Sequence, residues 1–339
     1  MSTAPRYVGK YQIIRLLGEG GMGTVYQAIA PGAKPDEYVA IKVLKSIKDL
    51  KRHAREVAVL RGIGHRNIIE CLDHGLNYLV MPLLDGTPLA TFLENNGELT
   101  LKEALEIGAQ ICDAADALHE LGVLHRDLNP GNIVLVPRLE GGWDVILIDF
   151  GIVKILFDDE EITNPEIDLK APKVVMGTLA YMSPEQAGGE KLGPPSDVYQ
   201  IGLILVRILT KASHYDNRPD EDILNLMATM QSAKPLDSAL KQTLDRGTWK
   251  LLNQLLAKDP QKRPSAAETS RCLRALIEGT DLLPDPVQAV KEPPPEPEQR
   301  YVVTAAPTSP NEGLVETVVD ESRPTLNPLW VAFWSLLLG

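Results

Sequence analysis

The stretch from His125 to Asn132, with the sequence HRDLNPGN, carries the residue types that phosphoryl transfer needs. Asp127 can hold an attacking hydroxyl group, and Asn132, five residues later, can hold a metal ion. Asp149, the first residue of an Asp-Phe-Gly triplet, follows an apolar run at 145–148, and a carboxylate at the end of a strand can also reach a divalent cation. Asp127, Asn132 and Asp149 are therefore the candidate catalytic and metal-binding residues.

A glycine-rich run near the amino terminus follows the pattern G-x-G-x-x-G-x-V. In such a run the glycines let a backbone hairpin lie over phosphate groups and donate N–H groups to them. It consists of Gly18, Glu19, Gly20, Gly21, Met22, Gly23, Thr24 and Val25. A dinucleotide-binding fingerprint would continue into a helix, whereas residues 26–28 continue here as a strand. The run therefore favours a phosphate-covering hairpin over an ordinary glycine-rich turn.

Lys42 ends the apolar, strand-like segment VAIK. A lysine at such a place is most often a solvated edge charge, but it can also neutralise the α- and β-phosphates of a nucleotide when a carboxylate holds it. Glu56 lies on the next amphipathic segment and shares a helical face with Leu60, one turn later. Glu56 is therefore the predicted partner of Lys42.

The elements that must position these residues change in type along the chain. Glycine-punctuated, β-branched segments predict an antiparallel sheet with strands at 11–17, 24–30, 38–44 and 78–83, and a helix at 51–61. From residue 100 onward the pattern predicts helices at 100–121, 198–209 and 249–257, and short strands at 133–136 and 145–148. Thr100 and Glu103 form a capping box for the first of these helices.

The composition is that of a globular protein without a general nucleic-acid partner. Of 339 residues, 44% are hydrophobic and 24% are charged, and the formal net charge is −12. An acidic chain lacks the basic surface that neutralises nucleic-acid phosphates. The first ten residues hold no apolar run and predict no signal peptide. Cys71, Cys112 and Cys272 show no metal-binding spacing, which indicates free thiols in a reducing cytosol.

In this order and at these intervals, the motifs resemble those of the eukaryotic-like (Hanks-type) Ser/Thr protein kinases of bacteria. The resemblance covers residues 11–277. It implies an α+β, two-lobed fold that binds a nucleotide between its lobes. The sheet-rich N-lobe would span about 11–83 and the mainly helical C-lobe about 84–277, after an amino-terminal extension at 1–10.

Further residues match the family beyond the catalytic motifs. The segment from Gly177 to Glu185, GTLAYMSPE, is similar to the end of the kinase activation segment. The resemblance implies that Thr178 contacts the catalytic Asp and favours Ser and Thr hydroxyl groups. It also implies that Glu185 pairs with a buried arginine, Arg263, and that Asp197 braces the catalytic loop.

The segment at 79–84, LVMPLL, is similar to the hinge that joins the two lobes in this family. The resemblance implies that Met81 is the gatekeeper beside the adenine and that the backbone of Pro82 and Leu84 faces the adenine edge. It also places Ala40 among the ATP-binding residues. Pro82 has no N–H group, but it retains the carbonyl oxygen that the family uses at this position.

The resemblance implies an ATP-dependent enzyme of bacterial signalling that phosphorylates Ser and Thr hydroxyl groups of protein substrates and of itself. Lys42 and the glycine-rich run would position the triphosphate, and Asn132 and Asp149 would hold Mg²⁺, with Mn²⁺ as an alternative metal. Asp127 would orient the substrate hydroxyl group and finally accept its proton. Catalysis would then rest on positioning and on charge stabilisation.

One position departs from the family pattern. Asn129 stands where Ser/Thr kinases carry a lysine near the transferred phosphate, and loss of that charge is expected to weaken transition-state stabilisation by about 1–3 kcal/mol. Two alternatives follow. The first is an ATP-binding pseudokinase scaffold. The second is a small-molecule phosphotransferase of the aminoglycoside type, because the segment DLNPGN also resembles the loop of those enzymes. Lys42 and Asp127 argue against the first alternative, and the segment at 177–185 argues against the second.

The carboxy-terminal part has a different composition. Residues 278–328 are rich in Pro, Glu, Thr and Ser and predict a disordered linker. The apolar tail at 329–339 is too short to cross a bilayer as a straight helix, since about ten residues reach only about 15 Å of a ~30 Å hydrocarbon core. It is either a truncated span, an interfacial anchor at 329–338 with Trp330 and Trp334 at the boundary, or a segment that docks on protein. The expected location is the cytoplasm, with or without membrane contact through this tail.

Thr317 lies in the linker within the sequence TVVD, which has the T-x-x-D form that phosphothreonine-binding modules read. Short matches of this kind arise often by chance in acidic linkers. A phosphothreonine-reading partner at Thr317 is therefore a hypothesis that rests on this motif alone.

Overall fold

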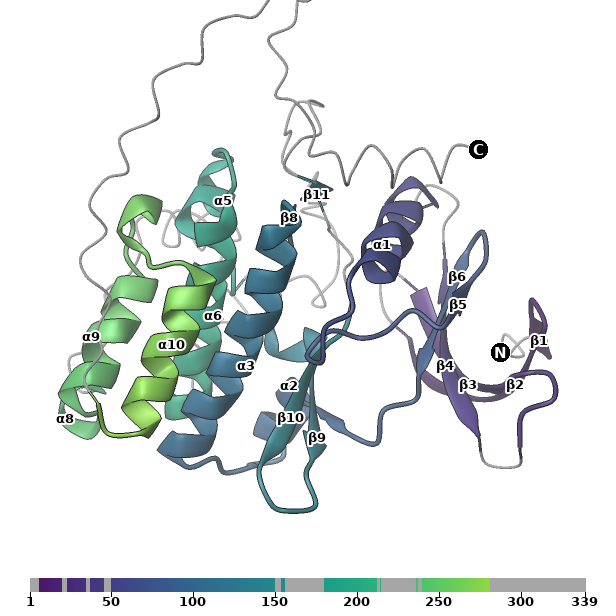
Figure 1. Cartoon of the computed structure of the whole chain (residues 1–339), viewed down its shortest axis with the longest axis horizontal. Coiled ribbons are helices and arrows are strands. Elements are labelled where there is room, and N and C mark those ends of the chain that lie inside the picture. Colours follow the sequence, from purple (N-terminus) through teal and green to yellow (C-terminus); the bar gives the residue numbers. More distant parts are fainter. Residues whose placement is uncertain are drawn as a thin grey trace, which may run out of the picture. The chain divides into compact units, whose positions relative to one another are not determined.

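The first part of the chain folds into a six-stranded antiparallel sheet of order β1-β2-β3-β4-β6-β5 (Figure 1). The computed structural model describes residues 6–19, 23–34, 37–45, 50–149, 154–155, 180–211, 214, 236 and 240–280. The strands of this sheet are β1 (Tyr7–Val8), β2 (Tyr11–Glu19), β3 (Gly23–Ile29), β4 (Tyr38–Leu44), β5 (Asp73–His74) and β6 (Tyr78–Pro82). Helix α1 (Leu50–Gly62) lies between β4 and β5 in the sequence.

The second part of the described chain is mainly helical. Its helices are α2 (Leu89–Glu94), α3 (Leu101–Glu120), α5 (Pro184–Gly188), α6 (Pro194–Thr210), α8 (Leu240–Thr243), α9 (Arg246–Leu255) and α10 (Ala266–Ile277), with 3-10 turns η2 (Pro130–Asn132) and η3 (Pro260–Lys262). Two small sheets join β7 (Thr87–Pro88), β9 (Ile133–Pro137) and β10 (Trp143–Leu147), and β8 (Val123–Leu124) with β11 (Lys154–Ile155). Helices α3, α6, α9 and α10 pack against one another (Figure 1).

Local sequence signals explain where the two longest helices begin and end. Helix α3 starts after Thr100, whose side chain accepts a hydrogen bond from the backbone N–H of Glu103, while Glu103 accepts from the backbone N–H of Thr100 at 2.9 Å. This is the predicted capping box. The helix stops at Gly122, which has a left-handed φ of 68°. Helix α6 is buried over most of its length, which fits its largely apolar sequence.

One large hydrophobic core connects α1 to the helices of the second part. It includes Val57 and Leu60 of α1, Ile107 of α3 and Leu203 of α6, all of them buried. Since Glu56 lies on the same helix as Val57 and Leu60, packing of α1 against this core fixes the place of its carboxylate.

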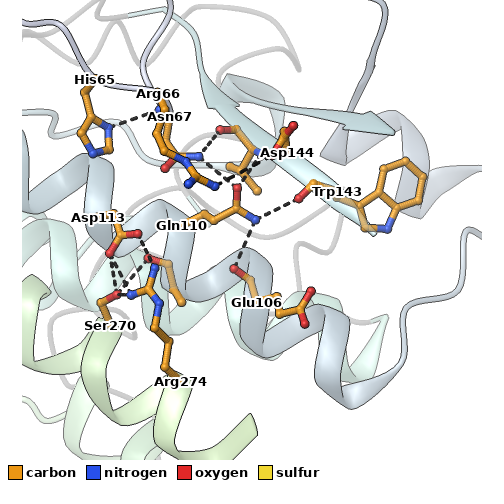
Figure 2. Close-up of polar contacts among 12 residues, drawn as sticks. His65, Arg66, Asn67, Glu106, Gln110, Asp113, Trp143, Asp144, Ser270 and Arg274 are labelled. Atoms are coloured by element: carbon orange, nitrogen blue, oxygen red, sulfur yellow. Dashed lines mark hydrogen bonds and ion pairs between the residues drawn. The ribbon is translucent and has the colours of Figure 1, made fainter. Parts of the chain in front are cut away.

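A polar network also fixes the loop after α1 to α3 and β10 (Figure 2). Nδ2 of Asn67 donates to Oε1 of Gln110 at 3.0 Å and to the carbonyl oxygen of Val145 at 2.7 Å. Gln110 accepts in turn from the backbone N–H of Val145 at 3.1 Å. Because β10 leads directly to Asp149, this network links the segment after Glu56 to the strand that carries Asp149.

The structure confirms the two-lobed α+β fold predicted from the sequence. The long elements agree with their predicted ranges, and the differences lie at the ends. Helix α6 begins four residues before residue 198, because prolines 194 and 195 are tolerated in a first turn, where no N–H partner is needed. The two-residue strands β1, β5 and β7 and the six-residue helix α2 were not predicted, because such segments are too short to show a clear periodicity.

Several predictions concern residues outside this description, among them the linker beyond residue 280, the apolar tail and Thr317. None of the helices formed by the described residues has both the length and the apolar character that a membrane crossing demands. The three cysteines are free thiols, of which Cys112 and Cys272 are buried.

Candidate functional site

One face of the large sheet carries four of the predicted ATP-binding residues. Val25 of β3 is paired with Lys42 of β4, and Ala40 of β4 is paired with Met81 of β6. Residues paired across strands, and residues two apart along one strand, point to the same side of a sheet. Val25, Ala40, Lys42 and Met81 therefore share one face.

The hairpin of β2 and β3 contributes the glycine-rich run. Gly18 is paired with Val25, and Glu19 lies at the exposed end of β2. A Cβ atom on Gly23 would lie 2.6 Å from the carbonyl oxygen of Val43, so the hairpin can approach β4 only with glycine at this position. Gly20, Gly21 and Met22 lie outside the described residues.

The ammonium group of Lys42 lies between two carboxylates. Its Nζ is 3.1 Å from Oε1 of Glu56 and 2.7 Å from Oδ1 of Asp149, and both Lys42 and Glu56 are buried. Burial by itself would lower the pKa of Lys42, but the charges of Glu56 and Asp149 outweigh it and raise that pKa above its usual value. The site therefore holds a fixed positive charge at one edge of the sheet face.

The candidate catalytic loop is joined to this ion cluster by a continuous series of hydrogen bonds. Nδ2 of Asn132 donates to the carbonyl oxygen of Asp127 at 2.8 Å and to its Oδ2 at 3.1 Å. The carbonyl oxygen of Asn132 accepts from the backbone N–H of Ile148 at 2.9 Å. Ile148 directly precedes Asp149, and Asp149 contacts Lys42. The structure therefore joins Asp127, Asn132, Asp149 and Lys42 in one unit.

Arg126 in the candidate catalytic loop and Asp149 adopt a left-handed backbone, which residues other than glycine rarely take. Arg126 has a φ of 67° and Asp149 a φ of 63°. Such conformations cost about 1–3 kcal/mol each and persist only where surrounding contacts hold them. The contacts around the loop of Arg126 come from α5 and α6.

Asp197 of α6 accepts three hydrogen bonds, two of them from the backbone of the candidate catalytic loop. Its carboxylate accepts from the backbone N–H of His125 at 3.0 Å and of Arg126 at 2.8 Å, and lies 2.8 Å from Nε2 of His119. Burial would raise the pKa of Asp197, but the hydrogen bond and charge of His119, with the other contacts, outweigh it and lower that pKa. The buried carboxylate therefore stays ionised and holds the backbone of the loop at His125 and Arg126.

Two glutamines hold the same loop and were missed by the sequence analysis. Oε1 of Gln200 accepts from the backbone N–H of Leu128 at 3.0 Å, and its Nε2 donates to the carbonyl oxygen of Arg126 at 3.0 Å. Nε2 of Gln186 donates to the same carbonyl oxygen at 2.8 Å. The residues on both sides of Asp127 are thus fixed by side-chain amides. No motif spacing in the sequence predicts these two glutamines.

The Asp197→Asn variant is expected to be less stable than the wild type by about 1.5–3 kcal/mol at neutral pH, the range for hydrogen bonds to a charged group. Because the pKa of Asp197 is depressed in the folded state, its stabilisation is present above the ordinary value of 3.8 and is lost as the pH falls through the folded value. Urea unfolding of both proteins across pH 3–7 measures this. A stability difference that stays constant over the range would contradict the assignment.

Glu185 of α5 and Arg263 form a bidentate ion pair. Nη1 and Nη2 of Arg263 lie 2.6 and 2.9 Å from the two carboxylate oxygens of Glu185, and both side chains are buried. The guanidinium also lies 4.7 Å from the ring centroid of Tyr199. Burial would raise the pKa of Glu185, but the hydrogen bond and charge of Arg263 lower it below its usual range.

The remaining predicted residues lie at the hinge and in the activation segment. Pro82 ends β6 and Leu84 follows it, both of them partly buried and next to Met81 in the sequence. Thr178 lies outside the described residues, so its contact with Asp127 stays a prediction.

A sheet-rich lobe, a helical lobe and a Lys–Glu–Asp ion cluster joined to an Asp–Asn loop are the features of the protein kinase fold. The chain belongs to the protein kinase domain family, whose match covers residues 11–272.

Relatives with curated names are Ser/Thr-protein kinases of bacteria. The chain is 35% identical over 288 residues to "Serine/threonine-protein kinase PkaA" of Streptomyces coelicolor, covering 80% of this chain and 50% of that one. It is 32% identical over 327 residues to "Serine/threonine-protein kinase PknK" of Mycobacterium bovis, covering 91% and 28%. It is 32% identical over 279 residues to "Serine/threonine-protein kinase PrkC" of Bacillus subtilis, covering 79% and 40%. The chain thus spans half or less of the length of these relatives.

The family uses ATP with a divalent metal ion, and the donor groups of this site fit that pair. Asn132 turns its amide nitrogen toward Asp127, which leaves its side-chain oxygen for a cation. This oxygen and the carboxylate of Asp149 are hard donors of the kind that Mg²⁺ takes. Lys42 supplies a charged group for phosphate, and Gly23 allows close approach of the hairpin backbone.

Proposed function

We propose that this chain transfers the γ-phosphoryl group of ATP to Ser and Thr hydroxyl groups of protein substrates, including its own, in bacterial signalling. The names of its relatives support this reaction. The observation that carries the proposal is the continuous series of contacts from Glu56 through Lys42 and Asp149 to Asn132 and Asp127. This series holds a phosphate-binding charge, two metal-binding oxygens and a proton acceptor in one rigid unit.

Each residue of the unit has a role in this proposal. Glu56 keeps the Lys42 ammonium in place to bind the α- and β-phosphates, and Asn132 and Asp149 hold the metal ion, which we propose to be Mg²⁺ with Mn²⁺ as an alternative. When bound, the metal ion neutralises charge that develops on the phosphate oxygens. Asp127 orients the substrate hydroxyl group and accepts its proton, so the chain acts mainly by positioning.

The nucleotide base would lie against the shared sheet face. Val25, Ala40 and Met81 supply its apolar walls, and the backbone of Pro82 and Leu84 would meet the adenine edge. Gly18 to Gly23 would cover the phosphates. We assign to Thr178 the selection of Ser and Thr hydroxyl groups, on the resemblance of the segment at 177–185 to the family.

Labelled ATP tests the proposal when it is offered with Mg²⁺, a basic protein substrate and, in a parallel reaction, an aminoglycoside. The expected result is label on phosphoserine and phosphothreonine after acid hydrolysis of the protein. Label on the aminoglycoside alone would place the chain among small-molecule phosphotransferases, and no transfer to either acceptor would favour a pseudokinase scaffold.

The remaining sequence hypotheses concern the organisation of the chain. We propose a kinase domain at 11–277, with lobes at about 11–83 and 84–277, followed by the linker at 278–328. The cytoplasm, where ATP and substrate proteins occur, is the proposed compartment. Membrane contact through 329–338 and a phosphothreonine reader at Thr317 rest on their sequence patterns alone.

A further inference from the structure

Asn129 makes contacts that its departure from the family pattern does not explain. Its Nδ2 lies 3.1 Å from the carbonyl oxygen of Asp127 and 3.1 Å from Oδ1 of the same residue. Its Oδ1 accepts from the backbone N–H of Gly131 at 2.9 Å. The side chain therefore points back at the proposed proton acceptor, and both ends of its amide are used.

The acceptor end of this amide shapes the turn that follows. Asn129 is the N-cap of η2, Pro130 occupies the first position of that turn, and the backbone N–H of Asn132 donates to the carbonyl oxygen of Asn129 at 3.0 Å. The turn thus places the side chain of Asn132 beside Asp127.

The donor end completes a clamp on the carboxylate. Oδ1 of Asp127 accepts from Asn129 and Oδ2 accepts from Asn132, each at 3.1 Å. The terminal torsion of an aspartate is broad when nothing holds it. Two amide donors, one on each oxygen, fix this torsion and so fix the direction in which the carboxylate meets a hydroxyl group.

We infer that Asn129 is a positioning residue that fixes the carboxylate of Asp127 for the reaction, through its Nδ2 donor. The inference rests on the proposed function for its kinetic part. Asn129 thereby contributes orientation at a position where a lysine would contribute charge.

The Asn129→Asp variant separates the two ends of the amide. Aspartate caps a turn as well as asparagine does, so the hydrogen bond from Gly131 is kept. The donor to Asp127 is lost, and a second carboxylate faces the first. We expect kcat to fall about 10- to 100-fold, the equivalent of one hydrogen bond to a charged group, with the KM for ATP and the melting temperature close to those of the wild type.

Asn129→Ser provides a second variant in case the added charge disturbs folding. Serine is also a good N-cap, but it has no amide donor. We expect kcat to fall in the order wild type, Asn129→Ser, Asn129→Asp. The matched control is Asp259→Asn, because Asp259 caps the proline-led turn η3 in the same way, accepting from the backbone N–H of Gln261 at 3.0 Å. This control should leave kcat unchanged.

A readout independent of activity keeps the inference testable if the proposed function is wrong. In ¹⁵N-labelled protein, the side-chain amide resonances of Asn129 are identified by their loss in Asn129→Asp. We expect them to shift and to exchange faster with solvent in Asp127→Ala. The inference would be overturned by a wild-type kcat in Asn129→Asp, or by amide resonances of Asn129 that stay unchanged in Asp127→Ala. Absence of transfer by the wild type would overturn only the proposed function.

Discussion

Replacing Asp127 with Asn is expected to lower kcat for protein phosphorylation about 10²–10⁴-fold, the range that a general base contributes. The change keeps the shape of the side chain but removes the acceptor for the hydroxyl proton. It also turns one carboxylate oxygen into an NH₂ group that faces an amide donor of Asn129 or Asn132. Nucleotide binding is expected to stay close to that of the wild type, because Lys42 and the sheet face are unchanged.

Steady-state transfer from labelled ATP to a basic protein substrate measures kcat, and titration with a fluorescent nucleotide measures binding. Glu120→Gln is the control, since it removes the same formal charge at the exposed end of α3. Equal kcat in the wild type and in Asp127→Asn would show that the observed transfer does not depend on this loop. The chain would then be better described as an ATP-binding scaffold.

The second large effect is expected on stability, at the pair of Glu185 and Arg263. Replacing Glu185 with Ala leaves the guanidinium of Arg263 buried without its carboxylate, which costs about 3–5 kcal/mol in comparable pairs. Arg263 also donates to the carbonyl oxygens of Ala257 and Pro195, at 2.8 and 2.9 Å. Loss of the pair therefore loosens the contact between α5, which carries Gln186, and the segment before α10.

Urea unfolding of Glu185→Ala, Arg263→Met and the double variant measures the effect as a double-mutant cycle. The double variant should cost clearly less than the sum of the two single changes, because it leaves no unpaired buried charge. The control is the exposed pair of Lys211 and Glu98, whose Nζ and Oε1 lie 2.8 Å apart, and Glu98→Ala should not change stability measurably. Additive costs at Glu185 and Arg263 would contradict the proposed coupling.

Much of the fold was predictable, because the long elements carry a clear period and clear ends. The β-branched run of β4 and the capping box of α3 are local signals that packing did not override. Elements such as α2 and β7 depend on neighbours that are distant in the sequence, and no local pattern marks them.

The residues of the candidate site were predictable from the sequence, but the side chains that hold them in place were not. Lys42 and Glu56 lie a short interval apart on a strand and a helix, and the structure brings them within 3.1 Å. Gln200 lies 72 residues from Leu128, to which its side chain is hydrogen-bonded, so no spacing could announce it. A polar residue in the middle of an apolar helix was the one available signal for Gln200.

The sequence by itself determined the family and the order of the motifs, because catalytic motifs need side chains whose chemistry few residue types perform. Only the tertiary structure decided how Asp127 is held, with Asn129 and Asn132 on its carboxylate and Gln200 and Asp197 on the backbone around it. The physical reason is that a side-chain amide can donate or accept hydrogen bonds, and a carboxylate can accept them, in many places. Which partner such a group finds depends on how distant segments pack and on the direction of the side chain. Neither can be predicted from the sequence alone.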